Sequence, residues 1–169
     1  NAGAIVADNL TEQCRKDIAE EVVDNLLAYH HTINPAGFGA IGAETFVDDW
    51  HSYYRPIVNS IYEKAKLMLE QGKMYPEALR IMELAIERYD DIFYLPITEA
   101  RLIHGDYNMW NIMVDESVEH ACAAIDPYNC SYADSEFDLY QLDNANGKSF
   151  GLLDLYINKQ PVSENFRLK

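Results

Sequence analysis

The rhythm of apolar residues changes once along this chain, at Leu95-Pro96. Before that dipeptide, three stretches place apolar residues every three or four positions, a spacing typical of amphipathic helices. After it, apolar residues come in short runs separated by polar, turn-prone segments, and such runs are typical of short strands. The runs are Arg101 to Ile103, Ile112 to Val114 and Ala121 to Ile125. The pattern predicts an α+β protein that is mostly α, with a small β insertion.

Each of the three expected helices has its own start or stop signal. Thr11 is placed to cap a helix that runs to His31. The second helix carries its apolar face from Trp50 to Met68 and stops near Gly72. The third starts at Pro76, a residue suited to the first helical turn, and its apolar face reaches Tyr89. We also expect an ordered loop at Ile33 to Glu44 and a further helix at Asp134 to Leu142.

Composition bounds the class of protein. The chain has 169 residues, 49% of them hydrophobic, so a single domain with one sizeable core is expected. Asp and Glu outnumber Lys and Arg by 28 to 13, which disfavours nucleic acid and anionic membrane and favours a cationic small molecule as partner. The alternative is that most of these carboxylates form a solvated surface. Composition leaves the oligomeric state open.

The three cysteines, Cys14, Cys122 and Cys130, show no CxxC or metal-ligand spacing, and their odd number argues against a disulfide framework. No apolar run approaches the roughly 18 residues of a membrane-spanning helix, and the start lacks a signal-peptide pattern. A cytoplasmic protein is therefore expected. Asn1-Ala2 fits the remnant of an expression tag, and the last residues stop within an amphipathic stretch, so we expect a piece of a longer protein.

A polar cluster interrupts the short apolar runs. His104, Asp106 and Asn111 lie in HGDYNMWN, and Asp126 follows the next apolar run in AAIDPYNC. A carboxylate on a loop can accept a proton from a hydroxyl group, while an amide oxygen and a second carboxylate can hold a hard cation such as Mg²⁺. Taken singly, each residue has an ordinary explanation, such as a core histidine, a turn residue or an Asx turn. Their joint order and spacing favour phosphoryl-transfer chemistry.

The motif HGDxxxxN, followed by IDP and then EFDL, resembles the C-terminal lobe of the aminoglycoside phosphotransferase and fructosamine kinase superfamily, which has a protein-kinase-like fold. The resemblance runs from about Thr11 to Leu142. Within the superfamily, Phe38-Gly39, Asp48 to Trp50 and the segment DPYNCSYADSEFDL are most similar to fructosamine kinases. Tyr107 to Trp110 differ from the residues usual in the family between Asp and Asn. The loop is therefore bulkier, and its substrate contacts do not follow from the resemblance.

The resemblance implies a role for each matched residue. Asp106 would be the catalytic base, and Asn111 and Asp126 would bind the Mg²⁺ that accompanies ATP. The supporting residues would be His104, whose ring holds the loop near the metal-binding turn, Gly105, which permits a tight backbone, and Asp138, which accepts backbone N–H bonds from the loop.

A kinase of this kind also needs a Gly-rich phosphate-covering loop and a strand Lys, and neither pattern occurs in this sequence. We therefore expect residues 1–169 to be a single C-terminal lobe without its ATP-gripping N-terminal lobe, and to turn over little alone. The expected function is ATP-dependent phosphorylation of a small-molecule hydroxyl, with a fructosamine-like or aminoglycoside-like acceptor. The alternative is a catalytically silent, kinase-like binding or regulatory module.

Overall fold

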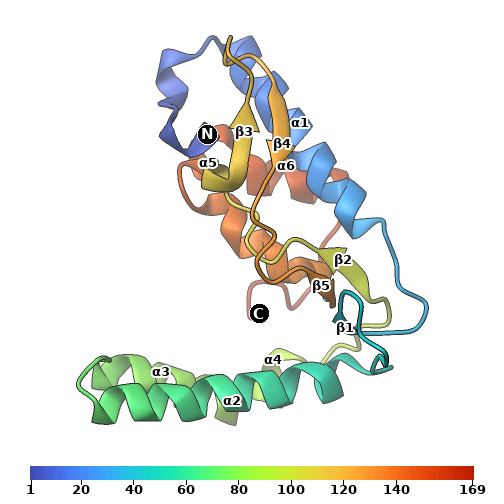
Figure 1. The fold of residues 1–169 in the computed structure, drawn as a ribbon, viewed down its shortest axis with the longest axis vertical. Helices are drawn as coiled ribbons and strands as arrows, with labels where there is room; N and C mark the ends of the chain where they lie inside the picture. Colours follow the sequence, from blue (N-terminus) through green and yellow to red (C-terminus); the bar gives the residue numbers. More distant parts are fainter.

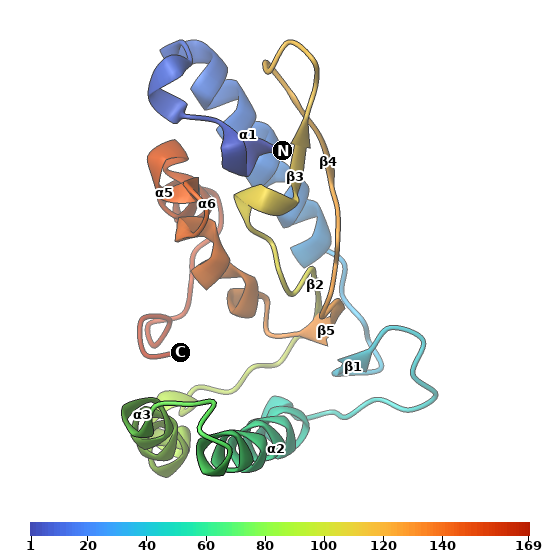
Figure 2. The same ribbon diagram turned by 60° about the vertical axis from the view of Figure 1, so that its left-hand side comes forward.

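The computed structural model describes residues 1–169 and places most of the helices at two ends of the molecule (Figure 1). One end contains α1 (Glu12–His30), α5 (Gly147–Phe150) and α6 (Leu152–Lys159). The other end contains α2 (Trp50–Glu70), α3 (Pro76–Glu87) and the short α4 (Tyr89–Ile92). A small sheet lies between the two ends (Figures 1 and 2). No helix is long and apolar enough to cross a membrane.

The predicted helix starts are confirmed, with the expected chemistry. The Thr11 side chain accepts a hydrogen bond from the backbone N–H of Cys14 at 3.1 Å, which caps α1. The start of α2 near Trp50 also agrees, and its cap, which was not predicted, is Asp49, whose side chain accepts from the N–H of Ser52 at 2.7 Å. Pro76 occupies the first turn of α3, where its missing N–H costs no hydrogen bond. These local signals therefore set the helix boundaries.

The predicted strands are confirmed as β2 (Arg101–Ile103), β3 (Ile112–Val114) and β4 (Ala121–Ala124). β3 and β4 form an antiparallel hairpin. Two strands were not predicted, β1 (Gly39–Ala40) and β5 (Ser131–Ala133), and they complete an antiparallel sheet in the order β1-β5-β2. Neither strand is long enough to show a two-residue alternation. The segment Ile33 to Glu44 was expected to be only a loop, and the structure shows that it contains the edge strand β1.

The helix predicted from Asp134 is present as a 3₁₀-helix, η4 (Ser135–Asp143), rather than an α-helix. Its N-cap is Asp134, whose side chain accepts from the N–H of Glu136 at 3.1 Å. Two shorter 3₁₀ turns precede α1, η1 (Ala2–Ala4) and η2 (Ala7–Asn9).

The buried apolar residues form two clusters. The larger one has 17 members and joins α1, α5 and α6 to the segment between β2 and β3. It includes Tyr107 and Met109, so the middle of HGDYNMWN faces the core rather than an acceptor, and these two bulky residues have a packing role. The smaller cluster has five members, centred on Phe38 and Trp50, and lies where α2 meets the three-stranded sheet.

Candidate active site

The loop His104 to Asn111 connects the two sheets, because β2 ends at Ile103 and β3 begins at Ile112. Its last residues form a 3₁₀ turn, η3 (Met109–Asn111), capped by Asn108, whose side-chain oxygen accepts from the N–H of Trp110 at 3.0 Å. The loop therefore has an anchored end on each side, and its polar side chains are held between them.

Asp138 braces the start of this loop from η4. One oxygen of its fully buried carboxylate accepts from the N–H of His104 at 2.8 Å, and the other accepts from the N–H of Gly105 at 2.7 Å. Because buried N–H groups are costly to leave unpaired, one carboxylate fixes two successive peptide groups. These are the backbone bonds that the family resemblance implied for Asp138.

A second contact holds Asp138 itself. The His30 ring lies 3.3 Å from the Asp138 carboxylate through Nε2 and 2.7 Å from the Tyr156 hydroxyl through Nδ1. His30, Tyr156 and Asp138 are all buried. No local sequence pattern marks His30 for this contact, because its partners lie 108 and 126 residues away.

Gly105 has φ of +82°, a conformation that residues with a Cβ rarely adopt. A Cβ at this position would also lie 2.6 Å from Asn129, in the segment after Asp126. The glycine therefore lets the loop turn sharply and lets that segment pack directly against it.

The His104 ring ties the loop to the residue before Asp126. Its Nδ1 accepts from the N–H of Asp106 at 3.3 Å, which leaves Nε2 to donate to the carbonyl of Ile125 at 3.1 Å. Burial lowers the pKa of His104, an effect that nearby carboxylates oppose, Asp138 most of all. The neutral ring with its proton on Nε2 satisfies both contacts.

Three side-chain amides converge on the Asp106 carboxylate. Asn108 and Gln141 each donate to Oδ1 at 2.9 Å, and Asn111 donates to Oδ2 at 2.9 Å. A carboxylate has about four lone-pair positions, so the free one belongs to Oδ2. No sequence motif assigned a role to Asn108 or Gln141. The Asp-x-Asn spacing was a possible signal for Asn108, whereas Gln141 lies 35 residues from Asp106 and had none.

Asn111 and Asp126 flank the same end of the β3–β4 hairpin. Ile112 pairs with Ala124, and the N–H of Ile125 donates to the carbonyl of Asn111 at 2.8 Å, which brings the backbones before and after the hairpin together. Asp126 is exposed and has φ of +56°. A non-glycine residue held in this region is strained, and such strain gathers at functional sites.

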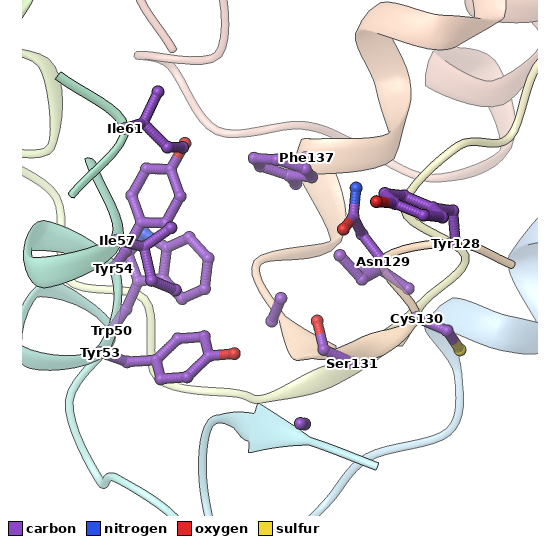
Figure 3. A pocket seen from close by; sticks show the side chains of 13 residues that line it. Trp50, Tyr53, Tyr54, Ile57, Ile61, Tyr128, Asn129, Cys130, Ser131 and Phe137 are labelled. Carbon is purple, nitrogen blue, oxygen red and sulfur yellow. The ribbon is translucent and has the colours of Figure 1, made fainter. Parts of the chain in front are cut away.

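A cavity of about 390 Å³ opens beside this loop (Figure 3). Its α2 wall presents Trp50, Tyr53, Tyr54, Ile57 and Ile61. Figure 3 shows these side chains facing a second wall made by Tyr128, Asn129, Cys130, Ser131 and Phe137. The cavity adjoins the catalytic-loop segment, because Ile103 also lines it and Asn129 packs against Gly105.

The fold, mostly helical with small antiparallel sheets, agrees with the protein-kinase-like class expected from the motifs. The sequence model of the phosphotransferase enzyme family matches residues 2–149, and the chain belongs to that family. The fold agrees with a crystal structure described as a "putative fructosamine-3-kinase" from Thermobifida fusca, at a TM-score of 0.58 and 20% identity over 94% of this chain and 54% of that one. The superfamily assignment made from the motifs is thereby confirmed.

The curated relatives are named as uncharacterized. The protein YcbJ of Escherichia coli K12 is 22% identical over an alignment that covers 96% of this chain and 54% of YcbJ. YcbJ of Shigella flexneri matches with the same identity and coverage. The chain thus spans about half the length of the curated relatives it matches.

Proposed function

We propose that this chain carries the acceptor-activating and metal-binding part of an ATP-dependent phosphotransferase that acts on a hydroxyl group of a small molecule. One observation carries the proposal, the Asp106 carboxylate held by three amides with one lone-pair position on Oδ2 left free. Asn111 and Asp126 lie at the adjoining hairpin end. The acceptor is proposed to be fructosamine-like or aminoglycoside-like, because of the family resemblance.

In this proposal Asp106 orients the acceptor hydroxyl and takes its proton on Oδ2 as the oxygen is phosphorylated. The amides of Asn108 and Gln141 occupy Oδ1 and prevent the carboxylate from rotating. Fixing the carboxylate before the acceptor arrives reduces the entropy lost on the way to the transition state. The His104 and Asp138 contacts hold the backbone from which Asp106 projects.

The donor set at the hairpin end fits Mg²⁺. The Asn111 Nδ2 donates to Asp106, so its carbonyl Oδ1 points to the opposite side of the amide, and Asp126 adds an exposed carboxylate. Mg²⁺ prefers oxygen ligands and often binds proteins through only one or two carboxylates together with substrate phosphates. When bound there with ATP, the ion would neutralise charge on the transferring phosphoryl group.

The two-lobe arrangement remains part of the proposal. We place the Gly-rich loop and the strand Lys that grip the phosphates in the remainder of the whole protein, in keeping with the 54% coverage of its relatives. The chain of residues 1–169 is expected to bind ATP weakly. Turnover by it alone at rates of about 1–100 per second, typical of kinases, would refute this arrangement.

The test is Asp106→Asn in the whole protein, with Mg²⁺, ATP and either a fructosamine or an aminoglycoside as acceptor. Loss of the base should lower kcat by roughly 10²–10⁴-fold with little change in the binding of ATP. The matched control is Asp143→Asn, an exposed carboxylate at the end of η4. Equal phosphorylation by wild type and the Asp106 variant would refute the assignment. A wild-type protein that binds ATP and acceptor but transfers no phosphate would favour the silent binding module.

A further inference from the structure

We propose that the cavity beside α2 receives an uncharged ring of the acceptor, so that the acceptor is a hydroxyl compound that carries an aromatic or similarly flat apolar group. This inference narrows the acceptor of the proposed function, because a fructosamine-like compound fits only if it carries such a ring and an aminoglycoside, which has none, does not fit. It rests on the proposed function in one respect, the identification of the occupant as the acceptor. The cavity volume of about 390 Å³ falls within the range of small-molecule pockets, about 300–1,000 Å³.

The lining has no charged side chain. Eleven of its 13 residues are hydrophobic, and its two other members, Asn129 and Ser131, are neutral hydrogen-bonding groups. A buried ammonium group needs a counter-charge, several acceptors or enclosing ring faces, because losing its hydration is costly. An acceptor that buried its amine here would find neither a carboxylate nor a ring of carbonyls among the lining side chains, so only ring faces would offset the lost hydration, and the cationic probe below tests that mode directly. The chain has a net charge of -15, but none of its acidic side chains lines this cavity.

Two carboxylates that stand next to lining residues in the sequence, Asp134 after Ala133 and Glu136 before Phe137, are paired with a lysine. Asp134 and Glu136 line a neighbouring cavity, where the Lys169 Nζ lies 2.7 Å and 2.5 Å from their respective oxygens. The side chains of all three are largely buried. Lys169 offsets one of the two negative charges, and both carboxylates line the neighbouring cavity rather than this one.

The aromatic rings are arranged to accept another ring. Trp50 and Tyr54 stack on each other, with ring centroids 4.8 Å apart and ring planes at 12°, so one face of each ring is covered by the other ring. Tyr54 and Phe137, which both line the cavity, contact each other edge to face at 5.9 Å and 79°. Edge-to-face and offset contacts are the preferred geometries between aromatic groups, and a flat apolar ligand can continue them.

The cavity also has the right neighbour for an acceptor site. Ile103 lines it one residue before His104, and the Asn129 side chain lies against Gly105 of the catalytic loop. A ring seated between α2 and Tyr128–Ser131 would therefore hold an attached hydroxyl on the side of the Asp106 loop. The exposed rims, Ile61 at 49% and Tyr128 at 84% exposure, would become covered on binding.

The experiment compares two neutral probes with identical hydroxyl groups, phenyl β-D-glucopyranoside and methyl β-D-glucopyranoside, and one cationic probe, methyl 2-amino-2-deoxy-glucopyranoside. Binding to the whole protein is measured by calorimetry without ATP. Burial of roughly 60 Å² of additional apolar surface corresponds to about a tenfold change in Kd, so the phenyl compound should bind at least tenfold more tightly than either methyl compound.

Two matched variants locate the site. Ile61→Asp places a carboxylate in the cavity wall at a half-exposed position, and it should weaken binding of the phenyl compound at least tenfold. Ile81→Asp makes the same change on α3, outside the cavity and at 69% exposure, and it should leave binding unchanged. Circular dichroism confirms that both variants are folded.

Equal binding of the phenyl and methyl compounds, including no binding of either at millimolar concentration, would overturn the inference, as would tightest binding of the amine. The outcome is separable from that for the proposed function. Preferential binding of the phenyl compound by both wild type and Asp106→Asn, with no phosphate transfer by wild type, would retain the cavity assignment and refute the phosphotransferase proposal. Efficient phosphate transfer to all three probes, without tighter binding of the phenyl compound, would retain the phosphotransferase proposal and refute the cavity assignment.

Discussion

The loop His104 to Asn111, which holds the proposed base, and the α2–α3 hairpin are built on opposite principles. The loop is held by buried hydrogen bonds from elements far apart in sequence, including Asp138, and its interior residues Tyr107 and Met109 belong to the 17-residue core. By contrast, α3 has no buried residue, and α2 buries only Trp50 and Ala65 among 21 residues. Stability is therefore concentrated where the proposed chemistry is, while the hairpin presents its side chains to the cavity and to solvent.

This contrast separates fixed from variable parts of such a lobe. A loop that must hold Asp106 within a few tenths of an ångström gains from being overdetermined by its surroundings. A hairpin with few buried contacts can change its surface residues at little cost in folding free energy, because exposed substitutions have small effects. The hairpin is thus suited to adjusting which acceptor is bound.

The largest expected effect comes from removing the brace. Asp138→Ala leaves the buried N–H groups of His104 and Gly105 without acceptors, and it should lower the free energy of unfolding by about 3–5 kcal/mol. Urea denaturation of the chain measures this change. Asp143→Ala, at the exposed end of the same 3₁₀-helix, is the matched control and should change stability by less than about 0.5 kcal/mol. Similar values for the two variants would refute the brace.

A smaller loss is expected for Gly105→Ala. This change adds a Cβ at φ of +82° and places it 2.6 Å from Asn129, so the expected cost is roughly 2–3 kcal/mol. Gly72→Ala, at φ of +67° with nothing within 4 Å, keeps the backbone strain without the clash and should cost about 1 kcal/mol. Thermal or urea unfolding of both variants separates the two contributions, and equal costs would remove any special role for the close approach.

The loop should also give the chain a pH dependence of stability between pH 8 and pH 5. Burial lowers the pKa of His104 below the value of about 6.5 that the unfolded chain has. The unfolded state then binds a proton before the folded state does, so this contribution to stability is full above about pH 6.5 and declines as pH falls through the folded pKa. Urea midpoints from pH 8 to pH 5 measure it for wild type and His104→Gln. An equally steep decline in both would assign the effect to other groups.

The smallest effect belongs to the hairpin. Ile81→Lys changes an apolar residue at 69% exposure on α3, and its effect on the free energy of unfolding should stay within about 0.5 kcal/mol. The same substitution at Ile18, fully buried on α1, provides the opposite extreme and should prevent folding. A large loss at Ile81 would show that the hairpin face is covered in the folded protein.

The helix starts could be predicted because their signals are local. Thr11 and Pro76 each act within one helical turn, so the sequence next to them contains the whole interaction. The strands β1 and β5 could not be predicted, because neither has a run of large apolar residues and both are defined by pairing with distant segments. Gly39 of β1 pairs with Tyr132 of β5, more than 90 positions away, and Ala133 of β5 pairs with Arg101 of β2. The 3₁₀ form of η4 was missed because its apolar pattern suits either kind of helix.

The sequence by itself determined which residues have the chemistry for phosphoryl transfer, since Asp106, Asn111 and Asp126 have functional-group types and spacing that are readable along the chain. Only the tertiary structure decided that Gln141 blocks one oxygen of Asp106, that His30 and Tyr156 stand behind Asp138, and that the acidic chain has a cavity without charge. The physical reason is distance along the chain. Hydrogen bonds and van der Waals contacts act over a few ångströms in space, and partners from 35 to 126 residues apart meet only once the core has formed.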